Sequence, residues 1–112
     1  MGYERSYASR APDRSEVDAL PGAVVLEFGT GWCGHCSAAQ PTIEAAFEAH
    51  PHVPHLKVED GRGRPLGRSF QVKLWPTLVF LRDGEEHARV VRPRDPQEVA
   101  AGLARIDPGD AP

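Results

Sequence analysis

The sequence predicts an α/β protein with one mixed central sheet and helices on both faces. An apolar, β-branched run, residues 24–28, is followed at once by an alanine-rich helical pattern. This succession is typical of strand–helix units whose strands pair in parallel. Asp83-Gly84, between two later strand-like runs, predicts a tight hairpin and therefore an antiparallel pair. The 112 residues are enough for one domain with one core.

Proline, glycine and helix-capping residues divide the chain into its elements. Pro21-Gly22 ends the first helix, and Pro51 closes the helix that starts at Cys33. Residues 95–98, Asp-Pro-Gln-Glu, form a capping box with proline at the first helical position. The expected elements are, in order, helix 13–20, strand 24–28, helix 33–50, strand 56–59, a short helix ending at 70, strands 77–81 and 87–91, and a helix after 95. We interpret residues 1–11 as an N-terminal tail or edge strand, residues 12–107 as the domain, and residues 108–112 as a C-terminal tail.

Composition and charge exclude several classes of function. The formal net charge of -3 gives no reason to expect binding to nucleic acid or to an anionic membrane. No run approaches the length of a membrane-spanning helix. Residues 1–14 lack the apolar region of a signal peptide. Because the only two cysteines stand together, no separate structural disulfide is possible. This fits a reducing compartment, most simply the cytoplasm. We also expect the protein to be a monomer.

The two cysteines, Cys33 and Cys36, stand three residues apart at the start of the predicted helix. Random placement would give this spacing only about 2% of the time. A thiol at a helix start meets unpaired backbone N–H groups and the positive end of the helix dipole, and both favour the thiolate that attacks disulfides. The pair is therefore interpreted as a redox site.

A zinc site is the alternative interpretation of the same thiols. Cys33, Cys36, His50 and His55 satisfy the C-x2-C-x13-H-x4-H spacing of a zinc finger. Proline residues lie between the two histidines, so no helix can present both to one metal ion. We therefore expect no metal, and we interpret four histidines as surface or packing residues: His50, His52, His55 and His87.

Several landmarks in order resemble the thioredoxin family over residues 15–106. Cys33-Gly34-His35-Cys36 resembles the active-site motif in the form typical of protein disulfide isomerase domains. Pro41 resembles the family's helix-kinking proline, residues 75–77 its cis-proline segment, and Asp83-Gly84 the hairpin turn after it. The resemblance implies the thioredoxin fold and a thiol–disulfide oxidoreductase that acts as a reductase. It also implies no bound cofactor, disulfide-bearing protein substrates, and recycling by a separate reductase or a thiol pool.

The resemblance also implies roles around the cysteines. Glu27 lies where the family keeps a buried acid, which is expected to accept the proton of Cys36, and Lys57 lies where it keeps that acid's lysine partner. An edge position open to water is the other interpretation of Glu27. Trp32 is expected to pack beside the site and to shield it. The expected site comprises catalytic Cys33, Cys36 and Glu27, supporting Trp32, Gly34, His35 and Lys57, and substrate-binding Trp75, Pro76 and Arg92.

Three residues depart from the family pattern. Gly29 stands where thioredoxins commonly have tryptophan, Trp75 is bulkier than the usual residue before the cis-proline, and Arg92 lies near a conserved glycine. These departures leave the chemistry intact and put the usual partners in doubt. They keep a second hypothesis open, a thioredoxin-fold binding or assembly module without redox turnover.

Overall fold

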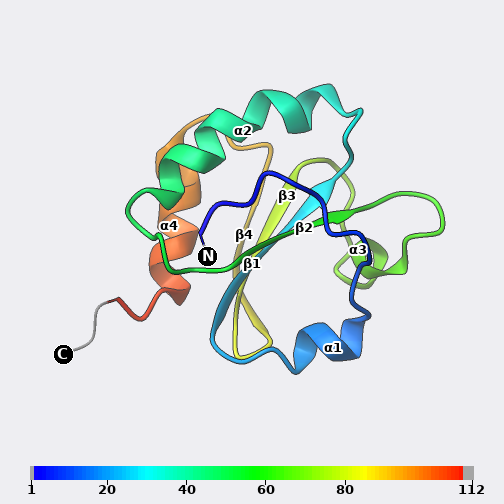
Figure 1. Ribbon diagram of the computed structural model, residues 1–112, viewed down its shortest axis with the longest axis horizontal. Helices are drawn as coiled ribbons and strands as arrows, with labels where there is room; N and C mark the ends of the chain where they lie inside the picture. Colours follow the sequence, from blue (N-terminus) through cyan, green and yellow to red (C-terminus); the bar gives the residue numbers. More distant parts are fainter. Residues whose placement is uncertain (1, 110–112) are drawn as a thin grey trace.

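The computed structural model describes residues 2–109, which form a four-stranded mixed sheet with helices on both faces (Figure 1). The predicted order and type of the elements are confirmed, and the boundaries differ by a few residues at most. Residues 110–112 of the expected C-terminal tail lie outside the described residues. The elements are, in order, α1 (Arg14–Asp18), β1 (Ala23–Gly29), α2 (Gly34–Phe47), β2 (His55–Glu59), α3 (Pro65–Ser69), β3 (Thr77–Arg82), β4 (Glu85–Val91) and α4 (Pro96–Ile106).

The sheet has the strand order β2-β1-β3-β4. β1 pairs in parallel with β2, to which α2 connects it, and antiparallel with β3. β3 and β4 form the predicted hairpin, in which Asp83 (φ 49°) and Gly84 (φ 80°) both have left-handed backbone angles. Such two-residue turns match the twist of the flanking strands. β1 is therefore a central strand, and its carboxyl end carries the chain into the Cys33 turn.

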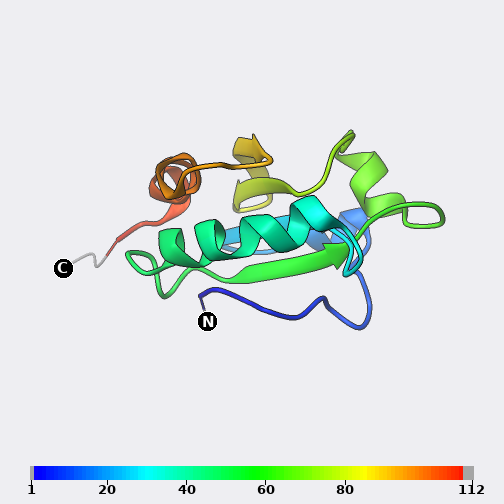
Figure 2. The same cartoon turned by 90° about the horizontal axis from the view of Figure 1, so that it is seen from above.

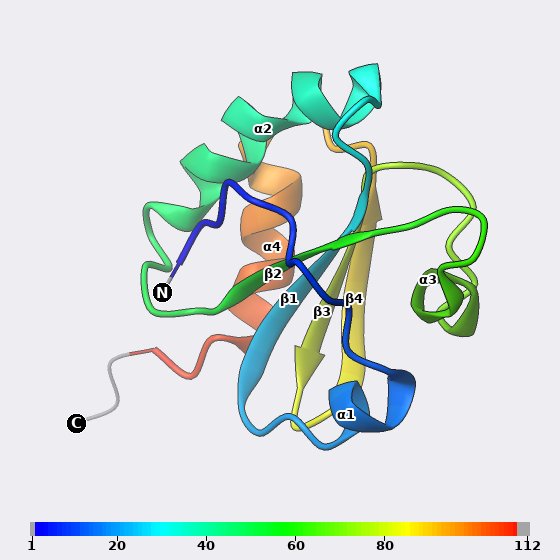
Figure 3. The same cartoon turned by 45° about the vertical axis from the view of Figure 1, so that its right-hand side comes forward.

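Alternation along β1 separates two hydrophobic cores. Val24, Leu26 and Phe28 belong to a core with residues of α1 and α3, whereas Val25 belongs to a core with residues of α2 and α4. Figure 3 shows the corresponding pairs of helices on opposite sides of the sheet. By the same alternation, Glu27 lies on the α2 side of the sheet.

The starts of α1, α2 and α4 are capped by side chains. The reciprocal capping box is at α1, where the Asp13 carboxylate accepts from Glu16 N–H and the Glu16 carboxylate accepts from Asp13 N–H. At α4 the predicted box is not formed in this reciprocal way, because Asp95 accepts from Gln97 N–H instead. α2 ends at Phe47, earlier than predicted. None of the helices within residues 2–109 is long and apolar enough to cross a membrane.

The N-terminal segment, residues 2–8, runs beside β2 (Figure 2). Isolated parallel bridges join Gly2 to Pro54 and Tyr7 to Lys57. The Gly2 N–H donates to the Val53 carbonyl at 3.1 Å, and the Ala8 N–H donates to the Lys57 carbonyl at 2.8 Å. The segment thus lies along the free edge of β2, next to the part of the chain that holds the cysteines.

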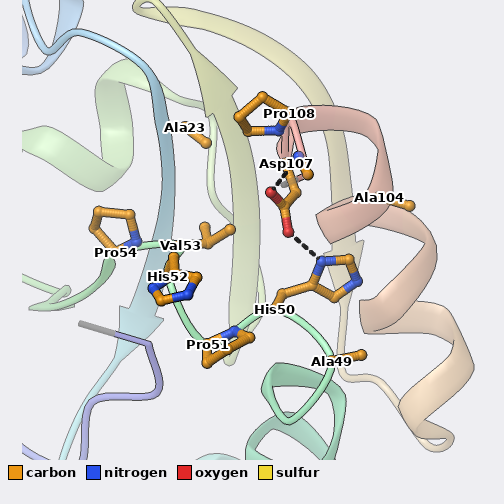
Figure 4. A pocket seen from close by; sticks show the side chains of 11 residues that line it. Ala23, Ala49, His50, Pro51, His52, Val53, Pro54, Ala104, Asp107 and Pro108 are labelled. Carbon is orange, nitrogen blue, oxygen red and sulfur yellow. Dashed lines mark hydrogen bonds and ion pairs between the residues drawn. The ribbon is translucent and has the colours of Figure 1, made fainter. Parts of the chain in front are cut away.

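A separate polar contact lies at the end of α2 remote from the cysteines (Figure 4). His50 Nδ1 is 2.6 Å from Asp107 Oδ2, and the Gly109 N–H donates to Asp107 Oδ1 at 2.8 Å. These two hydrogen bonds, that of His50 first, lower the pKa of Asp107 below its usual value. The contact ties the end of α4 to the loop before β2. It is separated from the cysteines by the length of α2, about 20 Å.

Candidate active site

The two cysteines lie at the amino end of α2, where β1 delivers the chain. Both are free thiols, and Cys33 is the N-cap residue of the helix. Its Sγ accepts the backbone N–H of Cys36 at 3.2 Å, so one of the unpaired amides of the first turn points at the sulfur. Cys33 is 8% exposed and Cys36 is 2% exposed. Cys33 is therefore the more accessible of the two cysteines, and its sulfur lies at the amino end of the helix.

Cys36 has the opposite character. Burial, followed by the hydrogen bond with Cys33, raises the pKa of the Cys36 thiol to about 12. A hydrogen bond from the Thr30 backbone acts against this rise, and the charge of Glu27 adds to it. At neutral pH Cys36 is consequently a protonated thiol, which must lose its proton before it can attack.

Glu27 is fully buried in the central strand, and this excludes the solvent-exposed edge position. Its two carboxylate oxygens have different partners. His55 Nε2 lies 2.8 Å from Oε1, and Gln40 Nε2 donates to Oε2 at 2.8 Å. Because the Glu4 backbone N–H donates to His55 Nδ1, Nε2 is the ring nitrogen that carries hydrogen and donates to Glu27. The carboxylate therefore has a donor on each oxygen.

Gln40 connects the acid to the cysteine helix. Its Nε2 also donates to the Cys36 carbonyl at 2.8 Å, and its Oε1 accepts from Tyr3 Oη at 2.7 Å and from Lys57 Nζ at 3.1 Å. Lys57 thus binds the amide that binds Glu27; its other hydrogen bond, at 3.2 Å, is to the Arg5 carbonyl.

Sequence reasoning missed Gln40 and the contact between His55 and Glu27. Gln40 lies four residues after Cys36, and this spacing places both on one side of a helix. His55 lies two residues before Lys57, so both side chains of β2 point to the same face. The predicted strand began at residue 56, which hid this relation.

Aromatic side chains border the cysteines on the surface. Trp32 is 79% exposed, so it lies beside the site without covering it. Its ring contacts that of Trp75 edge to face, with the centroids 5.6 Å apart. Trp75 is anchored through Nε1, which donates to Asp60 Oδ2 at 2.8 Å. The predicted cis peptide between Trp75 and Pro76 is present. At Gly34 an added Cβ would meet nothing within 4 Å, so packing does not require glycine there.

Arg92 binds the backbone carbonyl of Trp75, the residue before the cis proline. It follows β4 with φ 51°, a left-handed angle that favours glycine. Its Nε donates to the Trp75 carbonyl at 2.8 Å, and its backbone N–H donates to the Pro76 carbonyl at 2.9 Å. The first contact blocks the Trp75 carbonyl, which is the group expected to pair with an extended substrate.

We expect Arg92→Gly to lower the KM for a disulfide-bearing protein by about threefold, because one net hydrogen bond no longer has to be broken. Arg92→Ala should give a similar gain, since it removes the guanidinium and retains the strained backbone angle. Arg94→Ala is the control on the same loop and should leave KM unchanged. Steady-state kinetics would check this, and an increased KM for both Arg92 variants would show that the guanidinium attracts substrate.

The zinc ligand set does not assemble. His50 binds Asp107 and His55 binds Glu27, at opposite ends of the loop between α2 and β2. Within residues 2–109, no three His, Cys, Asp or Glu side chains gather closely enough to hold a metal ion.

An accessible sulfur held by a helix amide and a buried partner thiol three residues later are what reversible disulfide exchange requires. The fold and this pair together define the class of thiol–disulfide oxidoreductases. Comparison with known proteins gives the family. The thioredoxin family profile matches residues 11–105, and the chain belongs to the thioredoxin family.

Individual relatives agree with this assignment. The chain is 39% identical over 75 residues to a thioredoxin of Chlamydia trachomatis serovar D, covering 66% of this chain and 72% of that protein. It is 37% identical over 68 residues to thioredoxin H-type 1 of Nicotiana tabacum, covering 61% of this chain and 54%, about half, of that protein. The structure of reduced thioredoxin 2 from Pseudomonas aeruginosa PAO1 is similar at 55% identity and a TM-score of 0.80, covering 91% of this chain and 98% of that one.

Proposed function

We propose that the protein reduces disulfides of other proteins through the Cys33–Cys36 pair. The observation that carries this proposal is the Cys33 sulfur at the amino end of α2, where it accepts the Cys36 N–H. The Cys33 thiolate attacks a substrate disulfide, forms a mixed disulfide and releases one substrate sulfur as a thiolate. Cys36, after losing its proton, attacks Cys33 Sγ. This step releases the second substrate sulfur and leaves the Cys33–Cys36 disulfide.

Glu27 is the proposed acceptor of the Cys36 proton. Its burial below α2 and the influence of its charge on Cys36 support this role. Gln40 and His55 are positioning residues, because they fix the two carboxylate oxygens by hydrogen bonds. Lys57 supports the same network through Gln40. Trp75 and Pro76 are the proposed contacts for substrate backbone, and the Arg92 guanidinium competes with the substrate for the Trp75 carbonyl.

The proposal extends to the surroundings of the protein. Its substrates are disulfide-bearing proteins, and a separate reductase or a pool of small thiols returns the pair to the dithiol. No cofactor is needed for either step, because sulfur atoms carry both electrons. We propose a monomer in the cytoplasm that contributes to redox homeostasis; the absence of cysteines outside the pair supports a reducing compartment.

Reduction of insulin by dithiothreitol, followed by turbidity, tests the proposal. The wild-type protein should accelerate precipitation, and Cys33→Ser should abolish the acceleration. A folded protein whose pair can be reduced but which gives no acceleration would favour the alternative, a binding or assembly module without redox turnover.

We expect His35→Pro to make the cysteine pair more reducing. His35 is exposed in the first turn of α2, between the cysteines. When protonated, its imidazole adds positive charge beside Cys33 and stabilises the thiolate, and hence the reduced form. Loss of this charge should lower the potential by tens of millivolts, because about 30 mV corresponds to ~1.4 kcal/mol. Equilibration with glutathione measures the potential, and an unchanged or higher value would remove His35 from the mechanism.

A further inference from the structure

Gly29, at the end of β1, lies beside the buried sulfur of Cys36 and has no room for a side chain. A Cβ added to Gly29 would lie 2.5 Å from Cys36 Sγ and 3.0 Å from Tyr7 Oη. No side chain can be placed there without moving one of these groups. Glycine at this position therefore allows a tyrosine hydroxyl from the N-terminal segment to approach the resolving cysteine.

Tyr7 is held in this place by several contacts. Its Oη donates to the Thr30 carbonyl at 3.0 Å. Lys57 Nζ lies 4.7 Å from the centroid of its ring, a cation–π contact, and the Tyr7 backbone forms a bridge with Lys57. Burial, and after it the interaction with Cys36, raises the pKa of Tyr7 well above its usual value. The phenol thus stays neutral and can act as a hydrogen-bond donor.

Two donors are available to a thiolate formed at Cys36. The Thr30 backbone forms a hydrogen bond that lowers the pKa of Cys36, and the Tyr7 hydroxyl lies next to the Cys36 sulfur, since both are close to the position that a Gly29 side chain would take. A hydroxyl hydrogen rotates to the better acceptor. While Cys36 is protonated, the Thr30 carbonyl is the acceptor for Tyr7. When Cys36 is ionised, its sulfur is the stronger acceptor, because hydrogen bonds to charged groups are stronger.

We infer that Tyr7 stabilises the Cys36 thiolate in the resolving step by turning its hydroxyl from the Thr30 carbonyl to the Cys36 sulfur. The inference rests on the proposed function. The Cys36 S–H bond breaks and its proton leaves to the acceptor, for which Glu27 is proposed. The thiolate then forms a bond with Cys33 Sγ as the bond between Cys33 and the substrate breaks. The substrate sulfur leaves with the electron pair and takes up a proton from solvent.

The surface next to Cys36 is hollowed, so the proton that leaves Cys36 has a route to solvent. A hollow of about 450 Å³ opens between the N-terminal segment and α2. Its lining includes Tyr7, Cys36, Gln40 and Lys57. The N-terminal segment is therefore one wall of the site, and its removal should slow resolution at least as much as the loss of Tyr7, because the segment also binds Gln40, His55 and Lys57.

Tyr7→Phe tests the inference in a single-turnover experiment. Reduced protein reacts with the disulfide of 5-thio-2-nitrobenzoate, an aromatic thiol whose release is visible. The first thiol released reports attack by Cys33, and the second reports attack by Cys36. We expect Tyr7→Phe to leave the first release unchanged and to slow the second about tenfold, the effect of one hydrogen bond to a charged group. The midpoint of the pH profile of the second release should also move to higher pH than in the wild-type protein, because the Cys36 thiolate has lost a hydrogen-bond donor.

Other groups that face Cys36 also influence the pH profile of the second release, and their effects must be distinguished from that of Tyr7. These are Cys33 in the same turn, Glu27 on β1, Lys57 on β2 and Arg5 in the N-terminal segment. Ser6→Ala is the control, because it removes an exposed hydroxyl from the residue next to Tyr7 in the same segment. It should not reproduce the effect of Tyr7→Phe on the second release.

The outcomes are distinguishable. An unchanged second release in Tyr7→Phe, in a protein that unfolds at the wild-type temperature, would overturn the role of Tyr7. An equal delay in Ser6→Ala would overturn it as well, because any change in the N-terminal segment would then slow resolution. If the wild-type protein releases no second thiol at all, the proposed exchange between Cys33 and Cys36 fails, independently of Tyr7.

Discussion

Cys36→Ser is expected to convert the protein into a trap for its substrates. Cys33 remains at the amino end of α2 and can still attack a disulfide, but no second thiol is present to displace the substrate. Mixed disulfides should therefore accumulate and turnover should fall to background. Non-reducing electrophoresis and mass spectrometry would show adducts that disappear with dithiothreitol.

Cys33→Ser is the matched control for this experiment. Its remaining thiol, Cys36, is 2% exposed, and burial is the main cause that raises its pKa, so it should form no adducts. If Cys33→Ser forms adducts with substrates and Cys36→Ser does not, the assignment of attacking and resolving cysteines is reversed.

Glu27→Gln is expected to slow the resolving step by about 100-fold near neutral pH, the usual contribution of a general base. The sign of the change separates two roles. The charge of Glu27 raises the pKa of Cys36, so its removal lowers that pKa. If Glu27 acted only through this charge, the variant would resolve faster. A slower second release of the aromatic thiol would thus indicate loss of a proton acceptor. An unchanged rate from about pH 6 to 9 would leave Glu27 with a structural role only.

The same substitution should also destabilise the fold. Glutamine replaces one carboxylate oxygen with an NH2 group, which then faces a donor from Gln40 or His55. A buried donor left without an acceptor costs about 1–3 kcal/mol. Chemical denaturation would measure this loss. Glu48→Gln, at an exposed position just after α2, is the control and should change neither stability nor resolution.

The arrangement of elements was accessible from the sequence because it depends on local signals. Proline and glycine mark the ends of helices, and Asp83-Gly84 suits the left-handed angles of the hairpin turn. Periodicity separates strands from helices. The position of Cys33 at a helix start follows from the same signals, and so does the expectation that its sulfur attacks disulfides.

The network around Glu27 was only partly accessible, because it joins residues far apart in the chain. The resemblance pointed to Lys57, which stands beside Glu27 in the register of β1 and β2. The amide of Gln40 nevertheless lies between them, and the partner bound directly on β2 is His55. Which of several polar side chains meet below a helix depends on the packing of α2 against the sheet.

The sequence by itself determined the class of fold and the pair of cysteines three residues apart at a helix start, since helix capping and spacing are local properties. Only the tertiary structure decided what surrounds the second sulfur. It buries Cys36 and Glu27, places the Arg92 guanidinium on the Trp75 carbonyl, and brings Tyr7 to the space left by Gly29. The physical reason is that burial and hydrogen bonding across the sheet edge depend on contacts between distant segments, which no local pattern encodes.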